Sequence, residues 1–334
     1  MAVHKRLSAV PDLTVRLGNL VIQNPVMVAS GTFGYGEEYH RLFDVDQLGA
    51  VVTKSISLKP RSGNPAPRIY ETPSGMLNSI GLQNVGLEAF VEKKMPFLRS
   101  LKKTKVVVNL AGESVAEYTQ LAERLDKVPG IAGFELNISC PNCERGGIEF
   151  GVDPKLTAEV VHRVRRVTRK TIIAKLSPNV TNIMTIAKAA ADAGADALSL
   201  INTLLALAVD SRTWKPRIAT VTGGLSGPAI KPVALRMVWQ VHRALPRVPL
   251  VGIGGIMTAE DAVEFVLCGA SAIEVGTANY INPHAPVAII NGFKEYLAHR
   301  GLHSPGQLVG QIKVPERLRG IPQLVSGKRN RRSP

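Results

Sequence analysis

A cysteine and an asparagine stand close together at the end of a run that has the composition of a buried strand. In GFELNISCPNC, residues 133–143, the apolar run ends at Asn137, and Cys140 comes three residues later, directly before Pro141. A thiolate can remove a proton from carbon, and its ordinary pKa of about 8.5 suits mildly alkaline conditions. The alternative for Cys140 is a small buried apolar side chain, which fits less well in so polar a segment. None of the seven histidines falls at a predicted strand end, so the thiol is the best candidate for a base.

The same loop contains a second cysteine, so that Cys140 and Cys143 form a C-x-x-C pair. Half a zinc site is one interpretation, but no second C-x-x-C follows, and we predict no metal site. A thioredoxin-like redox pair is another, although such pairs open a helix and here Pro141 follows the first cysteine within a loop. Together with Cys268 the chain has three cysteines, too few for a disulfide framework. Cys143 could still pair with Cys140 under oxidation and block it as a base.

Polar side chains also stand at the ends of other apolar runs. Six runs have a serine, lysine or asparagine at or just past the end: Ser30, Lys54, Asn109, Asn137, Lys175 and Asn202. Any one of them could cap a loop or a helix, but capping does not account well for the whole set. Asparagines offer donors and an acceptor, which suits a flat ring with alternating C=O and N–H groups. The lysines suit anions: Lys54 a carboxylate, and Lys175 a ring that becomes negative during reaction.

Two further runs end in glycine-bearing turns, GIGG at residues 252–255 and VGT at residues 275–277. Backbone N–H groups in such turns commonly hold a phosphate at the mouth of a barrel. A dinucleotide fingerprint would need glycine where Met257 stands. The turns therefore favour the phosphate of a mononucleotide or of a phosphorylated substrate.

The elements that must position these residues are eight short apolar runs, at residues 25–30, 50–55, 105–110, 133–139, 171–177, 197–202, 249–254 and 272–276. Several are nearly continuous in apolar residues, as in parallel strands buried on both faces. Helical patterns lie between them, at residues 154–170, 182–195, 228–245 and 258–270, and the last opens with Thr258 and has Asp261 three positions on. Eight β-then-α units predict an α/β protein with a (β/α)8 barrel, the alternative being a doubly wound open sheet. The carboxyl ends of barrel strands meet at one face, so the polar residues would surround one pocket.

The length of 334 residues fits one large barrel, which typically needs about 250 residues. We expect a single domain over residues 1–334, with the barrel at about 25–300. Residues 1–24 would form an N-terminal hairpin region that turns at a Gly-Asn pair. Residues 326–334 form a basic tail that we expect to be disordered.

The net charge is +15, and part of it lies in the basic tail. Aromatic residues are only 5% of the chain and do not alternate with the basic ones, so a nucleic-acid partner is not expected. No apolar run approaches the roughly 18 residues of a membrane span, and the N-terminus lacks the apolar region of a secretory signal. We expect a cytoplasmic protein that is not embedded in a membrane.

The motifs NSIGLQNVG, ELNISCPN, AKLSPN, INTL, TGGLSGPAIKP, VGIGGI and VGTA occur in this order. Together they resemble the class 1 dihydroorotate dehydrogenases, and more closely the 1B branch, to which ASGTFGYG and GNPAPRIYETPSGMLNSIGLQN add. The resemblance runs from about Leu13 to the end of the last helix. Membrane-bound class 2 enzymes differ, because they add a hydrophobic N-terminal extension and carry serine at the place of Cys140.

The resemblance implies an FMN-dependent barrel, with one FMN per chain, that oxidises (S)-dihydroorotate to orotate in pyrimidine (UMP) synthesis. Cys140 would take the C5 proton while a hydride leaves C6 for N5 of FMN. Substrate contacts would come from Lys54, Asn78, Ser79, Ile80, Gly81, Leu82, Asn137, Asn202 and Thr203. FMN contacts would come from Ser30, Lys54, Ser55, Asn109, Asn137, Lys175, Ile201, Gly227, Gly254, Gly255, Gly276 and Thr277.

The resemblance also implies a partner for electron transfer. An iron–sulfur cluster typically needs four thiolates, which three cysteines cannot supply. In the family, a second subunit carries FAD and a 2Fe–2S cluster and passes electrons to NAD, in a heterotetramer of two chains of each kind. Cys143 and the apolar segment at residues 202–210 depart from the family pattern.

Two other functions fit parts of the sequence. One is an FMN barrel of the tRNA-dihydrouridine synthase type, for which the basic charge and a loop cysteine would also serve, but which would carry an RNA-binding domain after the barrel. The other is a non-catalytic basic protein that binds partners through the barrel and the tail. Flavin absorbance and its bleaching by dihydroorotate would distinguish the three.

Overall fold

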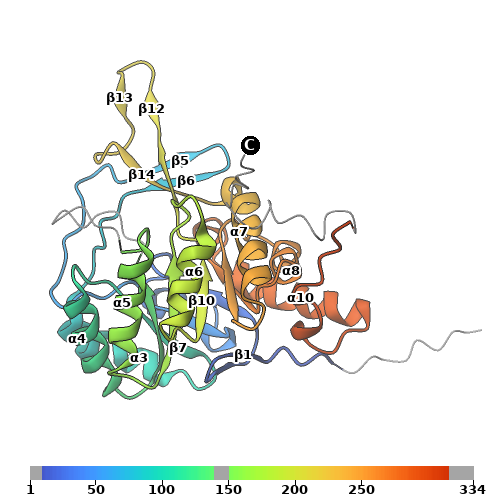
Figure 1. Cartoon of the computed structure of the whole chain (residues 1–334). Helices are drawn as coiled ribbons and strands as arrows, with labels where there is room; N and C mark the ends of the chain where they lie inside the picture. Colours follow the sequence, from blue (N-terminus) through green and yellow to red (C-terminus); the bar gives the residue numbers. More distant parts are fainter. Residues whose placement is uncertain (1–9, 139–149, 316–334) are drawn as a thin grey trace, which may run out of the picture.

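Eight parallel strands close into a barrel in the computed structural model, which describes residues 10–138 and 150–315 (Figure 1). The order around the barrel is β10-β15-β16-β3-β4-β7-β8-β9. The strands are β3 Val26–Val28, β4 Ala50–Val52, β7 Lys105–Leu110, β8 Ile131–Asn137, β9 Thr171–Leu176, β10 Ala197–Leu200, β15 Leu250–Ile253 and β16 Ala272–Val275. Each lies within or largely overlaps one of the eight predicted runs, so the predicted (β/α)8 barrel is confirmed and the open sheet is not the fold.

Two hydrophobic clusters explain why these strands are apolar on both faces. One fills the barrel interior and includes Met27, Val52, Val107 and Ile173. The other lies between the strands and the surrounding helices. Successive side chains of a strand point to opposite faces, so a strand buried on both sides needs apolar residues throughout.

The surrounding helices are α2 Gly86–Ala89, α3 Met95–Ser100, α4 Val115–Asp126, α5 Pro154–Arg165, α6 Ile183–Asp192, α7 Lys231–Ala244, α8 Ala259–Leu267 and α10 Ala285–Arg300. Short α1 Glu37–His40 and α9 Ala278–Ile281 follow β3 and β16. A π-helical segment, η2 Phe90–Lys94, joins α2 to α3, and single 3-10 turns are η1 Val45–Gln47, η3 Pro228–Ile230 and η4 Pro305–Gln307. The predicted capping pair is confirmed, because Thr258 and Asp261 each accept a hydrogen bond from the other's backbone N–H, at 3.2 and 2.9 Å.

The predicted N-terminal hairpin is also confirmed. It consists of β1 Val15–Leu17 and β2 Leu20–Ile22, which pair antiparallel around Gly18, whose φ is 59°. All four apolar hairpin side chains that face inward join the cluster inside the barrel. The hairpin therefore closes the end of the barrel opposite the carboxyl ends of the strands.

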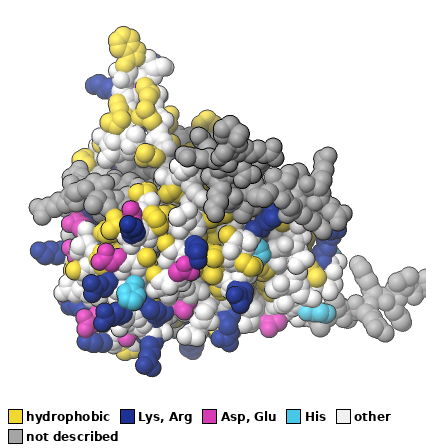
Figure 2. Space-filling model, viewed as in Figure 1, with side chains coloured by type: hydrophobic (Ala, Val, Ile, Leu, Met, Phe, Trp, Pro, Cys, Tyr) yellow, Lys and Arg dark blue, Asp and Glu magenta, His cyan; other side chains and the backbone are white. Residues whose placement is uncertain are grey.

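Two antiparallel sheets that the sequence did not predict stand over the carboxyl ends of the barrel strands (Figure 1). The larger, with order β11-β14-β6-β5, joins segments after β4 and after β10: β5 Ile69–Thr72, β6 Gly75–Asn78, β11 Leu204–Leu207 and β14 Thr222–Ser226. The smaller is a projecting ribbon of β12 Val209–Asp210 and β13 Lys215–Pro216. The ribbon exposes apolar side chains, among them Trp214 at 88% exposure (Figure 2).

Within the described ranges, no helix combines the length and the apolar character needed to cross a bilayer. The cytoplasmic location stays a prediction from the sequence.

Candidate active site

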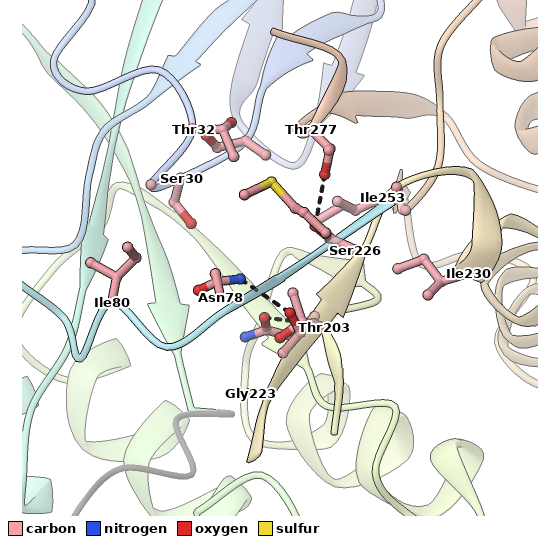
Figure 3. Close-up of a pocket in the computed structure, with 18 of the residues that line it drawn as sticks. Ser30, Thr32, Asn78, Ile80, Thr203, Gly223, Ser226, Ile230, Ile253 and Thr277 are labelled. Carbon is pink, nitrogen blue, oxygen red and sulfur yellow. Dashed lines mark hydrogen bonds between the residues drawn. The ribbon is translucent and has the colours of Figure 1, made fainter. Parts of the chain in front are cut away.

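A cavity of about 440 Å³ lies between the carboxyl ends of the barrel strands and the four-stranded antiparallel sheet. Barrel-side walls come from the carboxyl ends of β8, β9 and β15 and from segments that follow β3, β4, β9, β10, β15 and β16. The sheet contributes Met76, Asn78 and residues of β14. Figure 3 shows Ser30 and Thr277 on the barrel side, with Asn78 and Thr203 facing them. The volume is within the range of about 300–1,000 Å³ that ligand sites occupy.

The structure brings nearly all the predicted site residues together around this one cavity. Those lining it are Ser30, Lys54, Ser55, Asn78, Ser79, Ile80, Gly81, Leu82, Asn137, Lys175, Ile201, Asn202, Thr203, Gly227, Gly254, Gly255, Gly276 and Thr277. Asn109 is fully buried behind Ser55 and is not among the lining residues. Cys140 and Cys143 lie outside the described residues. The individual roles of all these residues stay predictions.

Lys175, at the floor of the cavity, lies among acidic and hydroxyl groups. Its Nζ is 3.2 Å from Oγ of Ser30, 3.4 Å from Oε1 of Glu135 and 3.5 Å from Oε2 of Glu274. Burial opposes the charge on Lys175, but the acidic side chains of Glu135 and Glu274 outweigh it and raise the pKa of the lysine. The floor therefore presents a cation to whatever lies above it.

An amide network joins the floor to the wall of the cavity. Asn109 donates from Nδ2 to Oε1 of Glu135 at 2.7 Å and accepts from Oγ of Ser55 at 2.5 Å. Asn202 donates from Nδ2 to Oδ1 of Asn137 at 3.2 Å, and the hydroxyl of Tyr118 holds the backbone there by donating to the main-chain carbonyl oxygen of Asn137 at 2.6 Å. These bonds fix the orientation of the amides before any ligand arrives.

Another side of the cavity is formed by Lys54 and the loop at residues 78–82. Burial, and then the positive charge of Arg68, lower the pKa of Lys54. The hydroxyl of Ser79 is buried and has no hydrogen-bond partner within residues 10–138 and 150–315. A buried hydroxyl normally has a partner, so this one suits a polar ligand in the cavity.

Glycines shape the part of the cavity after β15 and β16. Gly254 and Gly255 have φ of 121° and 76°, values that favour glycine. A Cβ on Gly255 would lie 2.8 Å from the Gly227 carbonyl oxygen, whereas a Cβ on Gly276 would meet no atom nearer than 3.6 Å. The side chain of Thr277 donates to Oγ of Ser226 at 2.8 Å, joining this part of the barrel to the antiparallel sheet (Figure 3). The space beside Gly276 and the turn at Gly254 suit a phosphate approached by backbone N–H groups.

Sequence reasoning missed two acidic residues that lie under the floor, Glu135 and Glu274, both at 0% exposure. Glu135 is the only ionisable residue of β8, and Glu274 is the only one of β16. A charged residue inside such a strand was the available signal, because carboxylates are almost never fully buried without a partner.

Comparison with known proteins agrees with this geometry. A sequence model of the family described as dihydroorotate dehydrogenase matches residues 12–297. The chain is 56% identical over 306 residues to a Geotalea daltonii protein, covering 92% of this chain and 100% of that protein. It is 57% identical over 303 residues to a Trichlorobacter lovleyi protein, covering 91% and 99%. Both relatives are named dihydroorotate dehydrogenase B (NAD(+)), catalytic subunit. The chain therefore belongs to the dihydroorotate dehydrogenase family.

Proposed function

We propose that this chain oxidises (S)-dihydroorotate to orotate with FMN bound in the cavity at the mouth of the barrel. The observation that carries the proposal is the convergence of Lys54, Lys175, three asparagines and two glycine turns on one cavity of a family member. Amides suit the C=O and N–H groups of a pyrimidine ring, and the cations suit its carboxylate and an electron-accepting ring. The reaction is a step of pyrimidine (UMP) synthesis. The family match and the named relatives favour it over a tRNA-reducing barrel or a non-catalytic binding protein.

FMN fits the residues present. Its phosphate would lie on the turns at Gly254–Gly255 and Gly276–Thr277, and its ring near Lys175 and Ser30. When bound, FMN supplies an acceptor for a hydride equivalent. Lys175 would stabilise the negative charge that reduction adds to the ring, because its own charge is held by the buried acidic groups of Glu135 and Glu274. Asn109 would act through Ser55 rather than from the cavity wall.

The substrate would lie against the loop at residues 78–82, where Lys54 would pair with its carboxylate. Asn78, Asn137 and Asn202 would hydrogen-bond its ring, and the unpartnered hydroxyl of Ser79 would gain a polar contact. The antiparallel sheet above them would exclude water from the reacting atoms. A dry site strengthens each of these electrostatic contacts.

Cys140 would be the base that removes the C5 proton. It lies outside the described residues, but the chain connects it to Asn137, which lines the cavity, through two intervening residues. Three extended residues span at most about 11 Å. Cys140 is thus the first residue after Asn137 whose side chain can act as a base near neutral pH.

Electrons would pass to NAD through a second subunit. The relatives are named as catalytic subunits of NAD-linked enzymes, which supports the need for a partner. Three cysteines, one of them assigned to catalysis, cannot ligate an iron–sulfur cluster. On the resemblance to the 1B branch, we propose that the partner carries FAD and the 2Fe–2S cluster, in a heterotetramer of two chains of each kind.

The proposal is tested by adding dihydroorotate to the purified protein without oxygen and following flavin absorbance. Bleaching with formation of one orotate per flavin is expected. A protein that binds no flavin, or whose flavin is bleached by reductants but not by dihydroorotate, contradicts the proposal. Oxidation of reduced flavin by uridine-containing tRNA would favour the tRNA-reducing alternative instead.

A further inference from the structure

Three ionisable side chains meet inside the barrel, at and directly under the floor of the cavity. Glu135 comes from β8, Lys175 from the neighbouring β9, and Glu274 from β16, which is not adjacent to either strand. The lysine Nζ is 3.4 Å from Oε1 of Glu135 and 3.5 Å from Oε2 of Glu274. Both carboxyl groups are completely buried, and the lysine side chain is 6% exposed. One cation therefore lies beside two acids, and the three groups together would carry a net negative charge if all were ionised.

The geometry shows that the two acids are not equivalent. Both face the one cation of Lys175 in a fully buried site, where two carboxylates would repel one another, so one of the two acids keeps a proton. Glu135 also accepts from Nδ2 of Asn109 at 2.7 Å and from Oγ of Ser199 at 2.8 Å. In contrast, Oε1 of Glu274 has no donor among the residues that the structure describes. The donors stabilise charge on Glu135, so the proton belongs to Glu274.

The electrostatics agree with this assignment. Burial, followed by the charge of Glu135, raises the pKa of Glu274 well above its ordinary value. Burial also disfavours charge on Glu135, but Lys175 and the hydrogen-bond donors outweigh it and lower the pKa of that residue. Lys175 then carries a positive charge, Glu135 carries a negative charge, and Glu274 is protonated and neutral.

We propose that Glu135, Lys175 and Glu274 form a charge-balanced unit in which Glu274 keeps its proton and Glu135 limits the positive charge that Lys175 presents to the flavin. The inference rests on the proposed function for the identity of the ligand. Both glutamates are positioning residues, since neither lines the cavity and they act through Lys175. The unit sets how strongly the floor favours the reduced flavin.

Replacing glutamate by glutamine should have different effects at the two positions. Glu135→Gln removes the one negative charge of the unit, while burial, the larger cause of its raised pKa, keeps the proton on Glu274. The reduced flavin should therefore be favoured by on the order of tenfold or more. For a two-electron couple, tenfold is about 30 mV toward a higher potential. Glu274→Gln exchanges one neutral group for another and should change the equilibrium less than about threefold. Asp192→Asn is the matched control, because it removes a carboxylate from an exposed ion pair with Lys188 on α6.

The test is a redox titration of the flavin-loaded wild-type protein and the three variants against dyes of known potential. The proposal is supported if the flavin potential shifts in Glu135→Gln and not in Glu274→Gln or Asp192→Asn. Equal shifts from Glu135→Gln and Glu274→Gln, or no shift from Glu135→Gln, overturn it.

Infrared spectroscopy gives a second measurement that does not depend on Glu135→Gln folding. The wild-type protein at neutral pH should show a C=O band of a protonated carboxyl group that disappears in Glu274→Gln and persists in Asp192→Asn. Absence of such a band in the wild-type protein overturns the proposal. The band is measured with or without flavin, so failure of the proposed function, seen as loss of flavin binding or of bleaching, is recognised separately.

Discussion

Replacing Lys175 by methionine is expected to destabilise the protein strongly at neutral pH and weakly in acid. Methionine fills a similar volume but leaves the buried carboxylate of Glu135 without the cation that lies 3.4 Å away. At that distance and an effective dielectric of about 20, unit charges attract by about 5 kcal/mol. Measured losses for one partner of a buried pair are about 3–5 kcal/mol.

Protonation of Glu135 limits the loss. An acid with an ordinary pKa of about 4.3 takes up a proton at pH 7 for about 3.7 kcal/mol, and at pH 5 for about 1 kcal/mol. In the wild-type protein the pKa of Glu135 is lowered, so its stabilisation is present above the unfolded pKa and is lost as pH falls through the folded pKa. We therefore expect Lys175→Met to lose about 3–4 kcal/mol at pH 7 and about 1 kcal/mol at pH 5.

Urea unfolding of flavin-free protein at both pH values measures the effect without the added stability that ligand binding brings. Lys188→Met is the matched control, because Lys188 and its partner Asp192 are 67% and 62% exposed. Exposed pairs contribute about 0–1 kcal/mol, so the control should change little at either pH. A Lys175→Met loss that is as small as the control's, or that does not shrink toward pH 5, would refute the reasoning.

Three further outcomes are expected. Cys140→Ala should keep the protein yellow but slow bleaching by dihydroorotate at least about 100-fold, measured by stopped-flow absorbance; unchanged bleaching would remove the thiol as the base. Gly255→Ala should weaken FMN binding at least about tenfold in fluorescence titrations, because the added Cβ would collide with the backbone. The control is Gly301→Ala, where φ is also positive, at 66°, but an added Cβ would meet no atom within 4 Å, so FMN affinity should be unchanged. Glu274→Gln should gain stability relative to wild type as pH rises above about 4.3. Above that pH the unfolded wild-type chain releases the proton of Glu274, whereas the folded wild-type chain keeps it because the pKa of Glu274 is raised. A constant difference in urea midpoints across pH would contradict this.

The barrel was predictable because its strands are buried on both faces and so appear in the sequence as apolar runs. The strand ends alone then identified Lys54, Asn137 and Lys175 as neighbours, since parallel strands end at one face. The antiparallel sheet over the cavity was not predictable in the same way. Its strand Ile69–Thr72 alternates exposed and half-buried residues, and Thr222–Ser226 contains two glycines, so neither has a distinct apolar run.

The two acidic residues under the floor of the cavity were missed for a different reason. Glu135 and Glu274 lie 139 positions apart in the sequence, and each is isolated among uncharged residues of its own strand. Only closure of the barrel brings both to Lys175, so the charge balance belongs to the tertiary structure rather than to any local pattern. The catalytic assignment of Cys140 stays a prediction.

A crystal structure of the flavin-loaded protein with orotate would test the central claim most directly. We expect the flavin ring beside Lys175, its phosphate on the turns at Gly254–Gly255 and Gly276–Thr277, and orotate between the ring and the loop at residues 78–82. Flavin bound outside this cavity, or orotate on the side of the ring away from that loop, would contradict it.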